Sequence, residues 1–297
     1  ALNARGDTDG AVAAIDRRFD AHGVDVPLAL LKIQLLGAAG DDEAVVDAFA
    51  QAIAARPADG GLYLALAEFH LERSATDRAE SVLRDAVPHV DEPTAVAAAL
   101  VRLVARSRGL DAAVGEVDVL LETIADPTRD LAFVATDLLA RAGRIDEAEA
   151  RLRDIVATSD EASAAALDAR AGLATFAVRR DEIDEARALI DAVLEIDPQH
   201  RAANLQASRI ALAQGDERAA IAAARTALTE DPRWAPGLRQ LADAYIADAE
   251  PDLAIDALAR LTRAAPEDVS AAAELADLLS RRGDDERALE VWDRVIE

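Results

Sequence analysis

The chain has 297 residues, of which 57 are acidic and 32 are basic, so its formal net charge is −25. A field of this sign repels phosphate backbones and argues against nucleic-acid binding, and the absence of cysteine excludes disulfides and thiolate metal sites. No run approaches the roughly 18 apolar residues of a membrane span, so we expect no direct membrane insertion.

The sequence repeats with a period of 34 residues. Pro198, Pro232 and Pro266 follow one another at this interval, and a fixed period of this length is typical of a stacked repeat array. In chain order the register predicts a partial repeat at 1–25, complete repeats at 26–59, 60–94, 95–128, 129–166, 167–200, 201–234 and 235–268, and a partial repeat at 269–297. Since both ends fall inside a repeat, we expect an excised segment of a longer array.

Each repeat is predicted to be a pair of helices, A and B. The sequence has no sustained alternating β pattern, and its composition is 52% hydrophobic but only 3% aromatic, which fits an alanine-rich helix array. B helices should begin about four residues after the A helices, which we expect near 27–38, 61–72, 95–106, 129–141, 164–179, 201–213, 235–247 and 269–281.

Small residues recur where helices A and B of one repeat should cross closely. The predicted pairs are Ala67/Ala79, Ala174/Ala186, Ser208/Ala220, Ala242/Ala254 and Ala276/Ala288. Glycines at 6, 40, 109, 143, 215 and 283 fall at the turn between the two helices, where a positive φ ends the first helix. One helix pair cannot bury its apolar stripe alone, so stacked neighbours should form a continuous core.

These positions resemble the tetratricopeptide repeat family. The repeat that ends at Pro266 carries Leu241, Ala242, Tyr245 and Ala254 at the places of the pattern W-x2-L-G-x2-Y…A-x3-F…P. The family's Trp at position 4 is replaced throughout, by Ala29, Tyr63, Ala98, Ala132, Arg170, Asn204, Leu238 and Ala272. The resemblance covers the whole chain and implies an all-α, right-handed superhelical solenoid, in which a concave face lined mainly by A helices binds peptides or partner helices.

The resemblance also implies that positions 2, 5, 9, 12 and 13 of each A helix face this groove. In the N-terminal half these and neighbouring positions predict an apolar strip of Leu30, Leu64, Leu71, Leu103 and Phe133. In the C-terminal half they predict a polar surface of Arg209, Arg239, Gln240, Asp243, Asp277 and Arg281, whose arginines would hold a polar or acidic peptide. The alternative for the first half is that Leu30, Leu64 and Leu103 pack between adjacent A helices and leave nothing exposed.

We find no arrangement of residues that indicates catalysis. The four histidines are scattered, and His70 falls at position 11, where a half-buried structural role is expected. No Ser–His–Asp set or phosphate loop has supporting context. We therefore expect no enzymatic activity, no metal and no cofactor in this segment.

The acidity has three explanations that stay open. It would reflect a solvated surface encoded by a GC-rich genome, a saline habitat that selects the same surface, or a basic partner.

The function expected from these features is a non-enzymatic scaffold that binds a peptide or partner protein in the concave groove. The alternative is a substrate-presenting or regulatory arm of an enzyme or transcriptional regulator whose active domain lies outside this segment. Phrases such as LARAGRIDEAEARL resemble bacterial envelope scaffolds and lipoproteins of this family, which implies an envelope assembly or export system; a cytoplasmic location stays open.

Overall fold

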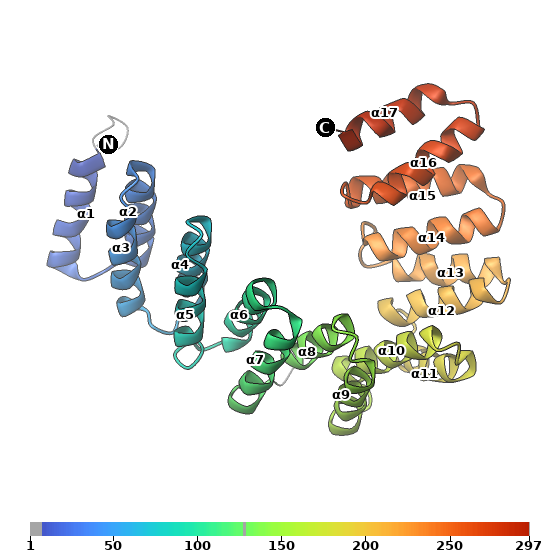
Figure 1. The fold of residues 1–297 in the computed structure, drawn as a ribbon, viewed down its shortest axis with the longest axis horizontal. Helices are drawn as coiled ribbons and strands as arrows, with labels where there is room; N and C mark the ends of the chain where they lie inside the picture. The colour runs from blue at the N-terminus through green and yellow to red at the C-terminus, as the bar shows by residue number, and fades with distance from the viewer. Residues whose placement is uncertain (1–7, 127–128, 297) are drawn as a thin grey trace. The chain divides into compact units, whose positions relative to one another are not determined.

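The computed structural model describes residues 8–126 and 129–296, and each regular element in these ranges is an α-helix (Figure 1). The A helices are α2 (Val26–Ala39), α4 (Gly60–Glu72), α6 (Pro93–Arg108), α8 (Asp130–Arg141), α10 (Ala164–Arg179), α12 (Arg201–Ala213), α14 (Ala235–Ala247) and α16 (Val269–Arg281). The predicted all-α fold class is confirmed for the described part of the chain.

The B helices alternate with them along the chain. They are α1 (Thr8–His22), α3 (Asp42–Ala55), α5 (Thr76–Ala86), α7 (Leu110–Thr123), α9 (Ile145–Thr158), α11 (Ile183–Ile196), α13 (Glu217–Ala227), α15 (Pro251–Ala264) and α17 (Asp285–Ile296). The helices group into two compact units, which we call unit 1 (residues 1–144, with α1–α8) and unit 2 (residues 145–297, with α9–α17).

The close crossings predicted from small residues are present in both units. In unit 1, Ala67 of α4 and Ala79 of α5 are buried, and in unit 2 Ala242 of α14 and Ala254 of α15 are fully buried. In the crossing of α12 and α13, the Ser208 hydroxyl donates to the carbonyl oxygen of Ala220 at 2.8 Å. Small side chains therefore let the two helices approach, and a buried hydroxyl is accepted there because it is hydrogen-bonded.

One residue in the turn between the A and B helices has a positive φ. The predicted glycines have positive φ at Gly40, Gly109, Gly143, Gly215 and Gly283, whereas Gly6 lies outside the described residues. Where the repeat has no glycine at this turn, Ser74, Asp181 and Ala249 adopt a positive φ instead. The turn geometry is thus kept even where a Cβ atom makes it unfavourable.

Each unit has its own apolar core between stacked helices. In unit 1, Leu100, Val101 and Val104 of α6 are fully buried. In unit 2, Leu241 and Tyr245 of α14 pack with residues of α15 and α16 in one cluster. These cores hold the A helices side by side, so their remaining faces line the candidate site.

Candidate protein-binding groove

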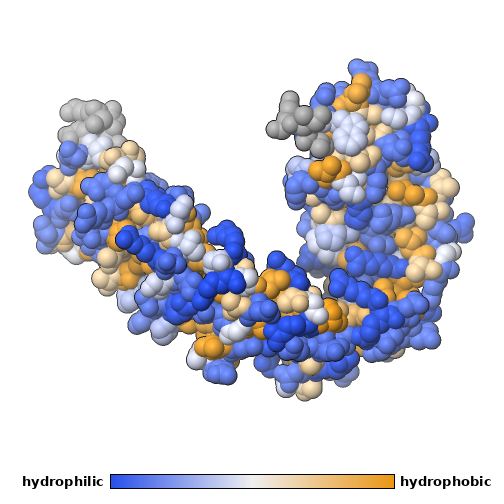
Figure 2. Space-filling view, in the orientation of Figure 1, coloured by the Kyte–Doolittle hydropathy of each residue, from blue (hydrophilic) through white to orange (hydrophobic). Residues whose placement is uncertain are grey.

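Three A helices of unit 1 enclose two neighbouring clefts. The first, between α4 and α6, has a volume of about 420 Å³ and includes Leu64, Leu71 and Leu103 in its lining. The second, between α6 and α8, has a volume of about 690 Å³ and is lined in part by Phe133 and Leu138. Figure 2 shows apolar side chains exposed around α8 within a largely hydrophilic surface.

Arg102 and Arg106 of α6 separate the two clefts. Both side chains line both clefts, and both residues are exposed. They lie four residues apart, so they project from the same face of the helix. Among the residues that the structure describes, no carboxylate pairs with either guanidinium group.

The rest of the groove carries few positive charges. Glu68 of α4 lines the first cleft. In the second cleft, Arg141 of α8 pairs with Asp137 one turn earlier, at 3.5 Å. Asp130 of α8 also lines the second cleft, so carboxylates and arginines are balanced in the lining, and Arg102 and Arg106 form a ridge of two arginines that pair with no carboxylate of the described residues. We call this surface, made of the two clefts and the two arginines, the unit 1 groove.

The apolar residues predicted from the sequence are partly brought together. Leu64 and Leu71 are half-buried walls of the first cleft, and Phe133 is a half-buried wall of the second. Leu30 of α2 is 40% exposed and lines neither cleft, so its side chain is not packed away as the alternative required.

Leu103 lines the first cleft, but its burial indicates that the register of α6 differs by one residue from the predicted one. It is only 4% exposed, because α6 buries Ala97, Leu100, Val101 and Val104 at the spacing that α14 uses for Leu238, Leu241, Ala242 and Tyr245. This alignment moves the register of α6 back by one residue. The groove position assigned to Leu103 thus belongs to Arg102, and Arg106 also falls on a groove position.

The matching A-helix face of unit 2 is polar and mostly self-paired. Arg239 of α14 donates to Glu274 at 2.6 Å and to Asp268 at 3.1 Å. Arg281 pairs with Asp277 at 2.8 Å at the exposed end of α16. The arginine forks predicted to receive a peptide there are therefore largely occupied by the chain's own carboxylates.

Asp243 and Gln240 are the residues of this surface whose polar groups are least well paired. Burial raises the pKa of the Asp243 carboxyl; Arg239 opposes the rise, Glu274 adds to it, and Arg209 opposes it. Gln240 is 5% exposed, and its Nε2 atom has no hydrogen-bond partner in the described structure. By contrast, Gln206 one repeat earlier donates through Nε2 to Thr175 Oγ1 at 2.8 Å. Exposed Arg209 lies 3.5 Å from Gln206.

Two other kinds of site are absent from the described ranges. These ranges contain no group of three or more His, Asp or Glu side chains arranged to hold a metal ion. Nor does any helix there have the length and apolar character that crossing a membrane requires.

Two family models match this chain. A family model described as tetratricopeptide repeat matches residues 139–208, and a second with the same description matches residues 239–297. A search of curated proteins returns no significant match.

Two solved structures share the fold at low sequence identity. A tetratricopeptide repeat protein from Parabacteroides merdae is 14% identical, with 80% of this chain and 91% of that chain covered and a TM-score of 0.53. A chain of the APC/C hetero-tetramer Cut9–Hcn1 is 15% identical, with 92% of this chain and 52% of that chain covered and a TM-score of 0.53. MamA from Desulfovibrio magneticus RS-1 is 18% identical, with 59% of this chain and 96% of that chain covered and a TM-score of 0.45.

Proposed function

Because the chain belongs to the tetratricopeptide repeat family, we propose that it is a non-enzymatic scaffold whose unit 1 groove binds an acidic, amphipathic peptide segment of a partner protein. The observation that carries this proposal is the pair of arginines without a carboxylate partner, Arg102 and Arg106, between two clefts that each have apolar walls. Apolar anchors flanked by charge often mark interaction sites.

The two clefts and the ridge suggest how such a segment binds. One apolar side chain of the peptide enters the cleft beside Leu64 and Leu71, and a second packs against Phe133 in the next cleft. Carboxylates between these anchors accept hydrogen bonds from Arg102 and Arg106, because guanidinium groups bind carboxylates in a forked geometry. A helix that presents anchors at intervals of three or four residues fits this pattern.

Charge makes the arginine ridge selective. The remainder of the chain is strongly acidic, so an acidic peptide is repelled from much of the surface and attracted near Arg102 and Arg106. The A-helix face of unit 2 is less suited to the same peptide, since Arg239 already pairs with Asp268 and Glu274.

A peptide selection tests the proposal. A phage library of random peptides of about 15 residues, long enough for roughly four helical turns, is selected on the chain, and the affinity of the enriched peptides is measured by fluorescence polarisation. We expect Leu or Phe together with Asp or Glu to be enriched. The double variant Arg102→Glu/Arg106→Glu should weaken binding by about tenfold or more, which corresponds to about 1.4 kcal/mol.

The matched control is Arg17→Glu/Arg18→Glu, two exposed arginines of α1 in the same unit. This variant makes the same change in net charge away from the groove and should bind the peptides about as tightly as the unchanged chain. Enrichment of peptides without acidic residues, or equal losses in the two double variants, would contradict the proposal.

The place of this scaffold in a bacterial envelope assembly or export system is a separate hypothesis. It is supported only by the resemblance of short phrases such as that at 139–152. Cell fractionation of the source organism with an antibody against the chain tests it, and recovery in the cytoplasmic fraction alone would exclude it.

A further inference from the structure

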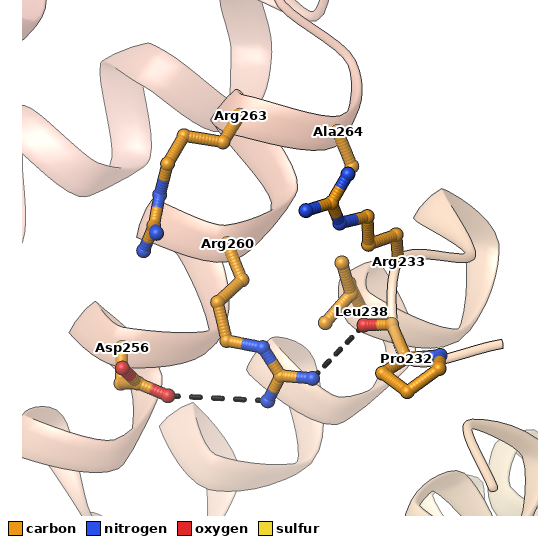
Figure 3. A pocket seen from close by; sticks show the side chains of 7 residues that line it. All are labelled: Pro232, Arg233, Leu238, Asp256, Arg260, Arg263 and Ala264. Carbon is orange, nitrogen blue, oxygen red and sulfur yellow. Dashed lines mark hydrogen bonds and ion pairs between the residues drawn. The ribbon is translucent and has the colours of Figure 1, made fainter.

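We propose that a pocket of unit 2, formed by the loop before α14 and by α15, binds a small phosphate monoester. The pocket has a volume of about 530 Å³ and is lined by Pro232, Arg233, Leu238, Asp256, Arg260 and Arg263, with Ala264 at its edge. Figure 3 shows the three guanidinium groups around it. This site is separate from the unit 1 groove, so the proposal does not depend on the peptide-binding function.

The charges that line the pocket are unusual for this chain. The lining contains three arginines and one carboxylate, that of Asp256, although the formal net charge of the molecule is −25. Asp256 lies 3.9 Å from Arg260, a long and exposed ion pair that contributes little. Asp231 is also close, but its carboxylate accepts the backbone N–H of Arg233 at 3.0 Å and does not line the pocket. The lining is therefore net positive.

Two of the arginines are held in position by backbone carbonyl groups. Arg260 donates through Nη2 to the carbonyl oxygen of Pro232 at 3.0 Å. Arg263 donates through Nε to the carbonyl oxygen of Ala259 at 2.8 Å, which leaves its two terminal nitrogens for another acceptor. These bonds orient the guanidinium groups without neutralising their charge, as a preformed anion site requires.

Arg233 supplies the third guanidinium group from the loop. Its backbone N–H is bonded to Asp231, while its side chain has no acceptor among the residues that the structure describes. A ligand with one negative charge would leave most of these donors unused. A phosphate monoester carries up to two negative charges and three terminal oxygens, so it matches three guanidinium groups that approach from two elements.

The apolar part of the pocket indicates that the ligand has an organic group. Leu238 is fully buried beneath the pocket, and Pro232 and Ala264 add apolar surface. The volume falls in the range of about 300–1,000 Å³ that small-molecule sites occupy, which is more space than a free phosphate ion needs. We therefore expect a monoester to bind more tightly than inorganic phosphate.

The test is isothermal titration calorimetry of the whole chain with phenyl phosphate, inorganic phosphate and benzoate in separate titrations. The salt concentration is low, about 50 mM NaCl, so that screening is weak. Phenyl phosphate should bind with one site and more tightly than the other two. Arg233→Gln and Arg263→Gln should each lower the affinity for phenyl phosphate by about tenfold. The control, Arg218→Gln, removes an exposed arginine of α13 outside the pocket and should leave the affinity unchanged.

Other results would overturn the proposal. Equal affinity for inorganic phosphate would assign the pocket to the free ion rather than to a monoester, and tighter binding of benzoate would assign it to a carboxylate. No binding of phenyl phosphate, or the same loss in Arg218→Gln as in Arg233→Gln, would show that the arginines form no site. Circular dichroism of each variant verifies that the helices are retained.

Discussion

Ala249 occupies, with a φ of 56°, the same place in the turn between helices A and B that Gly215 occupies one repeat earlier with a φ of 74°. A Cβ atom makes this left-handed conformation unfavourable by roughly 1–2 kcal/mol. Ser74 and Asp181 occupy the corresponding place in two other repeats. The repeat geometry therefore imposes the backbone conformation, and the side chain present there adapts to it.

Replacing Ala249 with glycine should stabilise unit 2. We expect Ala249→Gly to raise the free energy of unfolding by about 1 kcal/mol, because relief of the strained φ exceeds the entropy that glycine adds to the unfolded chain. Urea denaturation followed by circular dichroism measures the change. The reverse substitution, Gly215→Ala, should lower stability, and a loss of stability in Ala249→Gly would show that the turn is not strained.

Asp243 should be less favourable to folding as a carboxylate than as an amide. Its pKa in the folded chain is raised, chiefly by burial, so its contribution to stability is complete below the ordinary value of 3.8 and is lost as the pH rises through the folded-state pKa. At pH 7 the charged form is the costly one. Asp243→Asn should therefore increase the urea midpoint at pH 7 and have little effect at low pH.

Asp248→Asn is the control for this prediction. It removes the same charge from the exposed end of α14, so it reports only the general relief of repulsion in an acidic chain. Equal stabilisation by the two variants, or an Asp243→Asn gain that does not shrink on acidification, would contradict the role assigned to burial.

We expect His70 to make unit 1 less stable in acid. Burial lowers the pKa of its imidazole below 6.5, and the positive charges of Arg78 and Arg73 add to the effect. The unfolded chain therefore binds a proton before the folded chain does, and stability falls as the pH drops below about 6.5. His70→Leu should reduce this fall, measured as the difference in urea midpoint between pH 7.5 and pH 5, values of about one unit on either side of the ordinary histidine pKa.

The comparison for His70 is His89→Leu, which removes an exposed histidine of the same unit. That variant should keep the pH dependence of the unchanged chain. A variant His70→Leu with the same acid sensitivity as the unchanged chain would mean that carboxylates or other groups cause it.

The helix pairs could be predicted from the sequence because packing requirements recur with the repeat. α10 and α12, for example, begin and end at the predicted residues 164–179 and 201–213, since small residues, turn residues and prolines at fixed places determine each boundary. The repeat period also placed Leu64 of α4 and Phe133 of α8 on the predicted groove face, and both residues line the clefts.

The parts that could not be predicted lack this periodicity. In α6 the turn at Gly109 has a φ of 92° and a ψ of 172°, unlike the left-handed turn at Gly40. The buried positions of α6 are also one residue out of the common register, so the repeat period did not assign Arg102 to the groove. Arg233 and Arg260 come from a loop and a helix of different repeats, and no motif in the sequence connects them.

The groove itself is tested by introducing charge at its apolar walls. Leu64→Glu and Phe133→Glu place a carboxylate at half-buried positions of the two clefts. Since a half-buried side chain can turn its charge toward water, both variants should keep their helical circular dichroism signal. Each should nevertheless lower the affinity for the selected acidic peptides by about tenfold or more, because an apolar contact is lost and repulsion is added.

Two further substitutions make this result decisive. Leu30→Glu adds the same charge to an apolar residue of α2 that is 40% exposed and lines neither cleft, so it should leave peptide binding unchanged. Leu100→Glu places the charge at a fully buried position of α6 and should unfold unit 1, because an unpaired buried carboxylate is strongly destabilising. If Leu64→Glu and Phe133→Glu behave like Leu100→Glu, the two residues belong to the core. If they behave like Leu30→Glu, the peptides bind elsewhere, and in either case the unit 1 groove is not the binding site.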